Sequence, residues 1–109
     1  MKENIIYELI NGTGKVKEYD LDGYLEFEGE YLNGKRNGKV KEYFFGRLMY
    51  EGEYLNGKRN GKGKEYDYDG KLKFEGEYLN GKRNGKGKEY NDNGKLEFEG
   101  EYLNGERNG

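Results

Sequence analysis

Residues 51–66 read EGEYLNGKRNGKGKEY, and the same sixteen letters return at residues 75–90. A copy that differs only at Val40 occupies residues 28–43, and the opening letters EGEYLNG return once more at residues 99–105. The copies are offset by 23, 24 and 24 residues. Repetition at such a period is typical of a small structural unit that stacks on its neighbours, so the stack presents an extended surface rather than a single pocket.

The repeat accounts for the whole chain. A length of 109 residues suits one domain and is too short for two ordinary ones. Residues 17–19 and 23–27 fit the second half of an earlier, degenerate copy. We therefore expect one repeat domain over residues 1–109, with a degenerate first unit (1–27), full units (28–50, 51–74 and 75–98) and a partial unit (99–109).

The composition predicts a thin, open structure. Only 31% of the residues are hydrophobic and 39% are charged, yet 12 Tyr and 5 Phe argue against disorder because aromatic side chains bury a large area each. The net charge of −2 creates no global field that would select nucleic acid or membrane. The chain has no Cys, no recognisable leader sequence and no apolar stretch long enough to span a bilayer. We expect a soluble, cytoplasmic protein that meets membranes, if at all, only at their surface.

Within each unit the pattern predicts β-strands. Over residues 71–79, apolar or small residues alternate with charged ones, which places one set on a single strand face. That set is Leu72, Phe74, Gly76 and Tyr78. A turn-rich stretch (80–85) follows, then a second strand (86–91), and the Asp-Gly or Asn-Gly pairs at 22–23, 69–70 and 93–94 favour type I′ hairpin turns. The predicted fold is all-β: an elongated, single-layer antiparallel meander of tandem β-hairpin repeats with a period of 23–24 residues.

Two local questions stay open at this point. Val16 and Val40 stand where later copies have glycine, which suggests that this position of the second strand faces the apolar side. The tyrosines at 19, 43, 66 and 90 then fall on the opposite face, unless a bulge intervenes. Gly76 either leaves room for the ring of a neighbouring strand or marks a bend or bulge, and the two explanations carry equal weight.

The repeated residues resemble the MORN repeat (membrane occupation and recognition nexus). That pattern runs aromatic-x-Gly-x-aromatic, then Gly-x-x-x-Gly-x-Gly, and is carried here by Phe74, Gly76, Tyr78, Gly81, Gly85 and Gly87, and by Tyr50, Gly52, Tyr54, Gly57, Gly61 and Gly63. The chain departs from it in having Tyr for the common Trp, and Glu65 and Glu89 where eukaryotic repeats often have an aromatic residue. The tract Lys-Glu-Tyr-x-x-x-Gly-Lys-Leu is similar to bacterial MORN-variant repeats.

The resemblance implies an elongated, twisted β-sheet used as a scaffold, for self-association or at membranes, with no shared enzymatic activity. Its aromatic positions define an expected aromatic face. These residues are Phe27, Tyr31, Tyr50, Tyr54, Phe74, Tyr78, Phe98 and Tyr102.

The residue inventory argues against an enzyme. A Ser–His or Cys–His pair is impossible because the chain has no Ser, His or Cys, and no carboxylate is singled out among many. Residues 57–62 imitate a P-loop, but with one intervening residue too few and no following helix. Residues 65–70 imitate the start of an EF-hand loop but lack its final Glu. Both are predicted to be hairpin turns, and we expect no catalytic residue, cofactor, metal site or small-molecule substrate.

The charged turns suggest a surface. In a meander, every turn inside a unit lies on one rim and every return turn lies on the other. The first rim then gathers Lys35, Arg36, Lys58, Arg59, Lys82 and Arg83, and the second gathers Asp20, Asp22, Asp67, Asp69 and Asp92. A basic ladder could bind anionic lipid or an acidic partner. The alternative, that these residues only keep the turns soluble and discourage edge association, is favoured about two to one.

The last predicted strand bears on partners. Residues 96–103 match the first strand of a fifth unit. Its Leu96, Phe98, Tyr102 and Leu103 are candidates for end-to-end pairing with a second copy. We expect a scaffold or self-association module that binds a protein partner or a second copy of itself. The alternative is peripheral binding to acidic membranes. Nucleic acid ranks below lipid, because acidic residues alternate throughout the strands.

Overall fold

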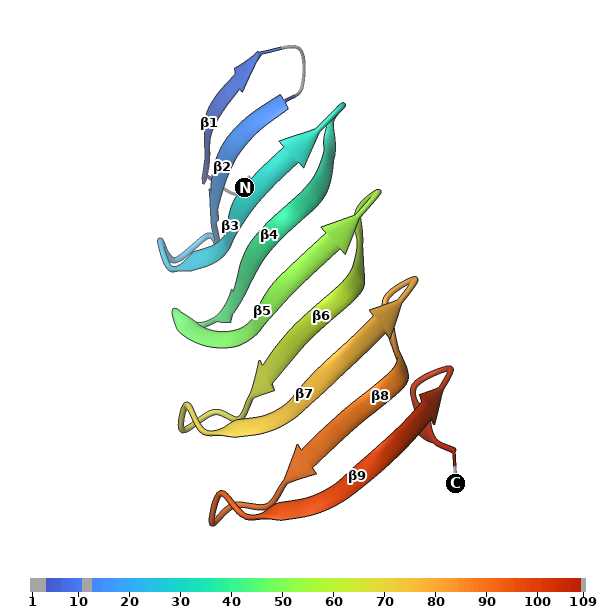
Figure 1. Ribbon diagram of the computed structural model, residues 1–109. Helices are drawn as coiled ribbons and strands as arrows, with labels where there is room; N and C mark the ends of the chain where they lie inside the picture. The colour runs from blue at the N-terminus through green and yellow to red at the C-terminus, as the bar shows by residue number, and fades with distance from the viewer. Residues whose placement is uncertain (1–3, 11–12, 109) are drawn as a thin grey trace.

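The computed structural model, which describes residues 4–10 and 13–108, is a single open antiparallel sheet in which each strand pairs with the next along the chain (Figure 1). This confirms the predicted all-β meander. The strands are β1 (Asn4–Ile10), β2 (Thr13–Tyr19), β3 (Leu25–Leu32), β4 (Lys35–Phe44), β5 (Arg47–Leu55), β6 (Lys58–Tyr66), β7 (Leu72–Leu79), β8 (Lys82–Tyr90), β9 (Leu96–Leu103) and the two-residue β10 (Glu106–Arg107).

The sheet is long and thin. It measures 43 × 28 × 19 Å, in keeping with strands of about 7–10 residues from β1 to β9 that lie about 4.8 Å apart. Residues 1–3, 11–12 and 109, which belong to the first and last predicted units, lie outside the described residues. Within the described residues, no helix has the length and apolar character needed to cross a bilayer.

The tight two-residue turns lie inside the units, and the longer turns lie at the Asp-Gly and Asn-Gly return positions, which is the reverse of the expectation. The turns inside the units are tight two-residue turns, and Asn56 and Gly57 have φ of 50° and 85°, as a type I′ turn requires. At the return turn of residues 20–24, Gly23 alone adopts positive φ, and its N–H donates to the Asp20 carbonyl at 3.1 Å. The prediction of type I′ turns at the Asp-Gly and Asn-Gly return pairs was therefore wrong, because those turns are longer and need only one left-handed residue.

The second strand of each unit begins earlier than predicted. The expected turn at residues 80–85 is only Asn80 and Gly81, and β8 starts at Lys82 rather than at Lys86. The extra residues fit because the pairing of β7 with β8 shifts between Gly76 and Tyr78. Residues 82–85 (Lys-Arg-Asn-Gly) thus belong to a strand with a bulge, and their position in a strand determines where their side chains point.

The core lies on one face of the sheet. It consists of Val16, Phe27, Val40, Tyr50, Tyr54, Phe74, Tyr78 and Tyr102, all less than one-tenth exposed. Glycines make room for the rings: a Cβ on Gly63 would stand 2.6 Å from Cε1 of Tyr50, and one on Gly87 would stand 2.7 Å from Cε1 of Phe74. At Gly76 a Cβ would stand 2.8 Å from Cζ of Phe74 in the same strand and 2.7 Å from Cα of Gly87 in the neighbouring strand, so the ring beside this glycine is not that of a neighbouring strand. A bulge follows Gly76 as well.

The register of the second strand is now settled. Gly63 lies opposite Gly76, and Val40 lies opposite Gly29, so this position faces the core. The following tyrosines lie on the other face, where each hydroxyl donates to a glutamate of the preceding strand. These bonds join Tyr43 to Glu28 (2.6 Å), Tyr66 to Glu51 (2.7 Å) and Tyr90 to Glu75 (2.6 Å).

Candidate functional site

Among the described residues, four equivalent groups of side chains cover the core face. Each group, here called a tetrad, joins a glutamate, an aromatic ring, a tyrosine and an arginine from three consecutive strands. The tetrads are Glu18, Phe27, Tyr31 and Arg36; Glu42, Tyr50, Tyr54 and Arg59; Glu65, Phe74, Tyr78 and Arg83; and Glu89, Phe98, Tyr102 and Arg107.

The tetrad of Arg83 shows the geometry. The guanidinium carbon lies 4.0 Å from the centroid of the Phe74 ring, and Nε donates to Oε2 of Glu65 at 3.0 Å. The Tyr78 hydroxyl donates to the same carboxylate oxygen. Arginine thus reaches from β8 across β7 to β6, and the tetrad fastens three strands together. The other arginines pair with their glutamates at 2.6–3.1 Å and stack on their rings at 3.9–4.4 Å.

The environment fixes the charge of these groups. Burial raises the pKa of Glu65, but hydrogen bonds from Arg83 and Tyr78 outweigh it, and the net pKa lies below the ordinary value. Burial and the hydrogen bond to Glu65 raise the pKa of Tyr78 well above its ordinary value. At neutral pH the glutamate is therefore ionised and the tyrosine protonated, which is the arrangement that makes the hydrogen bond strongest.

The residues of the predicted basic rim fall into two groups, the arginines and the lysines. Arg36, Arg59 and Arg83 fold back over the core, and their side chains are only 33%, 29% and 23% exposed. These arginines were expected to project from the rim. Instead, each lies in a strand next to a lysine, so its side chain points to the opposite face from that lysine. The lysines do project, since Lys35, Lys58 and Lys82 are exposed beside the turns.

The predicted aromatic face is brought together as a core rather than as an open surface. Six of its eight rings are buried, and Tyr31 and Phe98 are partly buried against them. Successive rings meet edge to face, as between Tyr50 and Tyr78 at 5.4 Å and between Phe74 and Tyr102 at 5.2 Å. Little of this face is left for a partner to touch.

The first rim carries exposed leucines beside its lysines, a set we call the Leu–Lys rim. Its members are Leu32, Leu55, Leu79 and Leu103, each about half exposed, and Lys35, Lys58 and Lys82. Hydrogen bonds between neighbouring units hold the turns in line: Gly57 N–H donates to the Arg36 carbonyl, and Gly81 N–H donates to the Arg59 carbonyl, both at 2.8 Å. The spacing along the Leu–Lys rim is therefore fixed by the backbone.

The second rim carries the expected aspartates, and also a chain of exposed rings. Tyr24, Phe44, Phe45 and Tyr68 come from three successive return turns and are each about half exposed. We call these four residues the aromatic turn cluster. Asp22, Asp69 and Asp92 are exposed on the same rim, whereas Oδ1 of Asp20 and of Asp67 each accepts two backbone N–H groups of its own turn.

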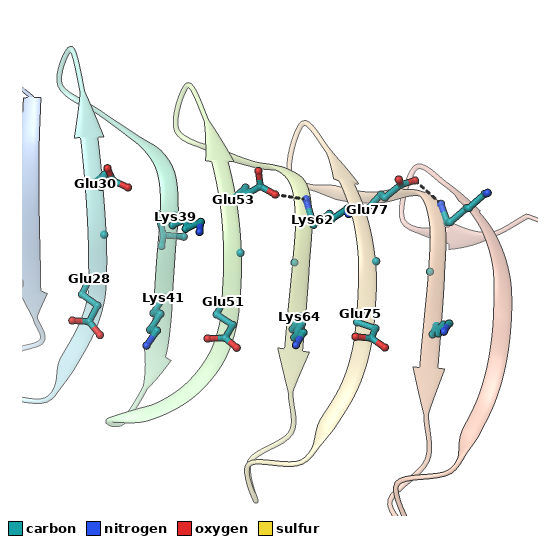
Figure 2. Close-up of a pocket in the computed structure, with 18 of the residues that line it drawn as sticks. Glu28, Glu30, Lys39, Lys41, Glu51, Glu53, Lys62, Lys64, Glu75 and Glu77 are labelled. Atoms are coloured by element: carbon teal, nitrogen blue, oxygen red, sulfur yellow. Dashed lines mark hydrogen bonds between the residues drawn. The ribbon is translucent and has the colours of Figure 1, made fainter.

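The face opposite the core is a groove of about 1280 Å³ with a floor of glycine backbone and two walls of charged side chains (Figure 2). Along each wall the charges alternate in sign, as in the cross-strand sequence Glu28, Lys41, Glu51, Lys64. Glu53 and Glu77 also accept backbone N–H groups, from Lys62 at 3.1 Å and Lys86 at 2.9 Å. Because neighbouring charges offset each other, the groove has no anchor for a purely acidic or purely basic ligand.

The MORN repeat model matches residues 27–39, 50–71, 74–95 and 98–109, together more than half of the chain. The chain belongs to the MORN repeat family. A search of curated proteins gave no significant match. MORN repeats are generally associated with protein or membrane interaction and are not a known enzyme family.

The two motifs that imitate ligand loops are ordinary parts of the MORN repeat. Residues 57–62 contain the tight turn and the start of β6. Residues 65–70 contain the end of β6 and a return turn closed by a 2.9 Å bond from Gly70 N–H to the Asp67 carbonyl. Residues 65–70 therefore contain a hairpin turn, as expected, whereas residues 57–62 contribute only Gly57 to their turn and otherwise belong to β6.

The candidate pairing strand is the last long strand of the MORN sheet. Leu96 and Leu103 of β9 are about half exposed, Phe98 is partly buried under Arg107, and Tyr102 is buried. β9 pairs with β8 from Leu96 to Tyr102, but with β10 only through Leu103 and Tyr102. Most of the outer edge of β9 thus has no partner strand among the described residues.

Sequence reasoning missed two features of these MORN repeats. The first is the set of glutamates that bind the arginines, for which the signal was available: Glu65 and Glu89 replace an aromatic residue of the family pattern, and each stands eighteen residues before an arginine. The second is the aromatic turn cluster. Its signal was a shortened unit, since residues 28–50 are one residue shorter than the later units and lack their Asp-Gly or Asn-Gly pair.

Proposed function

We propose that this MORN-repeat protein is a non-catalytic interaction module that scaffolds protein partners, including copies of itself. The observation that carries the proposal is the distribution of free groups. On the core face, the charged and hydroxyl groups bind one another within the tetrads. In the groove, neighbouring charges of opposite sign offset each other. The large exposed hydrophobic side chains lie mostly along the two rims. A scaffold needs repeated exposed contacts rather than a single pocket.

The titratable groups support a non-catalytic role. General acid–base catalysis works best with a pKa near the operating pH. Here burial and the neighbouring Glu42 raise the pKa of Tyr54 to about 12, and the Arg107 hydrogen bond holds the pKa of Glu89 below its ordinary value. Both shifts move the group away from neutrality, so they stabilise the sheet rather than prepare a proton transfer.

Light scattering across a wide concentration range, together with chemical cross-linking, tests the self-association arm. The apparent mass is expected to rise with concentration. A strict monomer at high concentration, combined with no partner captured by the immobilised protein, would count against the proposal.

A second candidate function is peripheral binding to acidic membranes, in which the Leu–Lys rim contacts the lipid. The observation that favours it is the pairing of half-exposed leucines with exposed lysines along one rim, which suits an apolar and anionic interface. Each lysine near the surface is worth about 1 kcal/mol, and the attraction declines with salt.

Liposome flotation tests the membrane candidate. The informative variant is Lys35→Glu with Lys58→Glu and Lys82→Glu, because replacement of the arginines would disrupt the tetrads instead. The matched control makes the same charge change at Lys71, Lys73 and Lys95, which are exposed near the other rim. Flotation should need anionic lipid, fail for the first variant and persist for the control. Equal flotation with neutral liposomes would contradict this function.

A further inference from the structure

The return turn between β4 and β5 departs from the repeat. The other described return turns are five residues long, begin with Asp20, Asp67 or Asn91, and use its side-chain oxygen to bind two backbone N–H groups. Between β4 and β5 the chain turns through Phe45 and Gly46 alone. This turn has no such polar side chain, and it presents two adjacent phenylalanine rings.

These rings form one continuous contact with the turns on either side. Phe45 meets Tyr24 edge to face at 6.2 Å, Phe44 and Phe45 meet at 4.6 Å, and Phe44 meets Tyr68 at 6.4 Å. Each of the four side chains remains 49–54% exposed despite these contacts. The aromatic turn cluster is thus a contiguous apolar strip at the edge of the sheet, with about half of each side chain exposed.

The turn itself gives no reason for a phenylalanine. Phe45 adopts φ of 49°, a left-handed conformation that bulky residues avoid. In the two-residue turns inside the units, the equivalent first position is asparagine, at φ of 50–51°. Asparagine suits this conformation, so the preference of the backbone has been overridden in favour of an exposed ring.

The surroundings of the cluster are acidic. Asp22 and Asp69 are exposed in the flanking turns, and Asp20 and Asp67 add two more carboxylates. Against these four stand two cations, the guanidinium of Arg47, which stacks on Tyr68 at 4.4 Å, and the exposed ammonium of Lys71. A surface that combines apolar rings with net negative charge complements a surface that combines apolar side chains with positive charge.

The Leu–Lys rim of the same chain has that chemistry. Leu55 with Lys58, and Leu79 with Lys82, face each other across their turns. Successive pairs are two strands apart, as are successive return turns, so both rims repeat at about 10 Å. Two copies laid side by side would therefore match turn for turn. The aromatic turn cluster spans three return turns and therefore about 20 Å, a length that suits a weak, concentration-dependent contact between copies.

We propose that the aromatic turn cluster of one copy docks on the Leu–Lys rim of a second copy. The inference rests on the proposed self-association and specifies its surfaces. The contact is heterologous, because each copy uses a different rim, so every bound copy leaves one rim of each kind free. The expected product is a side-by-side row of sheets rather than a closed dimer.

Complementary variants test this arrangement by sedimentation velocity. The first variant, Phe44→Thr with Phe45→Asn, disables the aromatic turn cluster and leaves the Leu–Lys rim intact. The second, Leu55→Ser and Leu79→Ser with Lys58→Glu and Lys82→Glu, disables the Leu–Lys rim only. Wild-type protein should show a mass that rises with concentration and falls with salt, and each variant alone should be monomeric. An equimolar mixture of the two should form a 1:1 dimer and nothing larger.

Leu96→Thr is the matched control, because it removes an exposed leucine outside both surfaces and should leave association unchanged. Circular dichroism verifies that each variant is folded, and Phe45→Asn alone replaces the first variant if the double change unfolds. Association that persists in both variants would overturn the inference and leave the proposed self-association standing, through another surface. A mixture that stays monomeric would also overturn it, because only a heterologous contact is restored by mixing. A wild-type chain that is monomeric throughout would overturn the inference and the self-association arm together.

Discussion

The guanidinium carbon of Arg83 lies 4.0 Å from the centroid of the Phe74 ring, which is fully buried beneath it. Equivalent contacts recur in all four tetrads, where the arginine also pairs with a glutamate two strands away. A single-layer sheet has no second layer to cover its core, and here the arginine side chains and neighbouring rings serve as that cover. The arginines are therefore structural residues.

Replacing Arg83 with methionine is expected to lower the free energy of unfolding. The change uncovers Phe74 and leaves the Glu65 carboxylate with only the Tyr78 hydroxyl. Because the pair is partly exposed, we expect a loss of about 2 kcal/mol, below the roughly 3–5 kcal/mol of a fully buried pair. Urea unfolding followed by circular dichroism measures it.

Lys82→Ala is the control for Arg83→Met, since Lys82 is exposed and adjacent in sequence. It should change the stability by less than about 0.5 kcal/mol. Adding Glu65→Gln to Arg83→Met should cost less than the sum of the two single changes, because the uncompensated charge is gone. Equal losses for Arg83→Met and Lys82→Ala would show that the guanidinium does not hold the sheet.

Glycine replacements distinguish crowding from backbone strain. An alanine Cβ at Gly63 would stand 2.6 Å from the Tyr50 ring and force it away from the core. At Gly57 a Cβ meets nothing within 4 Å, and only the positive φ of 85° opposes it. We expect losses of about 3 kcal/mol for Gly63→Ala and about 1 kcal/mol for Gly57→Ala. Thermal unfolding of both variants decides the matter, and a smaller loss at Gly63 than at Gly57 would refute the packing account.

Alkaline pH is expected to weaken the sheet through its tyrosines. Burial and Glu42 raise the pKa of Tyr54 to about 12, and burial and the hydrogen bond to Glu51 raise the pKa of Tyr66 to about 12, from an ordinary value of 10.0. As the pH rises above about 10, the unfolded chain releases these protons first. The stabilisation is therefore complete below about pH 10 and is lost as the pH rises through about 12.

Urea unfolding at a series of alkaline pH values, with tyrosinate absorbance recorded in parallel, measures this loss. Tyr66→Phe removes one titrating group and should show a shallower alkaline decline than the wild type. An unchanged stability through the alkaline range, or tyrosinate appearing in the folded protein near the ordinary pKa for all tyrosines, would contradict the assignment.

The strain at Phe45 predicts an unusual order of stabilities. Asparagine suits a left-handed turn position, so Phe45→Asn should hold or raise the stability, by up to about 1 kcal/mol, even though ring contacts are lost. A β-branched residue is disfavoured at positive φ, so Phe45→Val should lower it by about 1 kcal/mol. Thermal unfolding of both variants checks the order. A valine variant as stable as the asparagine variant would show that the turn is not strained.

Much of the fold could be predicted from the sequence because its decisive signals are local. Alternation over residues 71–79 identified the core face of β7, and the valines at 16 and 40 identified that of the second strands. The arginines were misplaced for a local reason too. Reading Lys82 and Arg83 as turn residues put both on the rim, whereas in a strand two consecutive residues must point to opposite faces.

The two rims could be predicted only in part. The exposed lysines and aspartates follow from the turn positions, and the leucines beside the lysines follow from strand ends. The aromatic turn cluster could not, because Tyr24, Phe45 and Tyr68 are far apart in sequence and meet only when three hairpins are aligned. A shortened turn signals a change of geometry, but gives no information about which side chains it brings together.

Nuclear magnetic resonance of the arginine side chains tests the central claim most directly, which is that the arginines cover the core and leave the rims to the lysines. The Nε–H groups of Arg59 and Arg83, which donate to Glu42 and Glu65, are predicted to exchange slowly with water. The guanidinium groups of Arg36, Arg59 and Arg83 are predicted to show ring-current shifts from the rings beneath them. Rapid exchange at Arg59 and Arg83, with random-coil shifts for all three residues, would show that the guanidinium groups project into solvent, and would contradict the account.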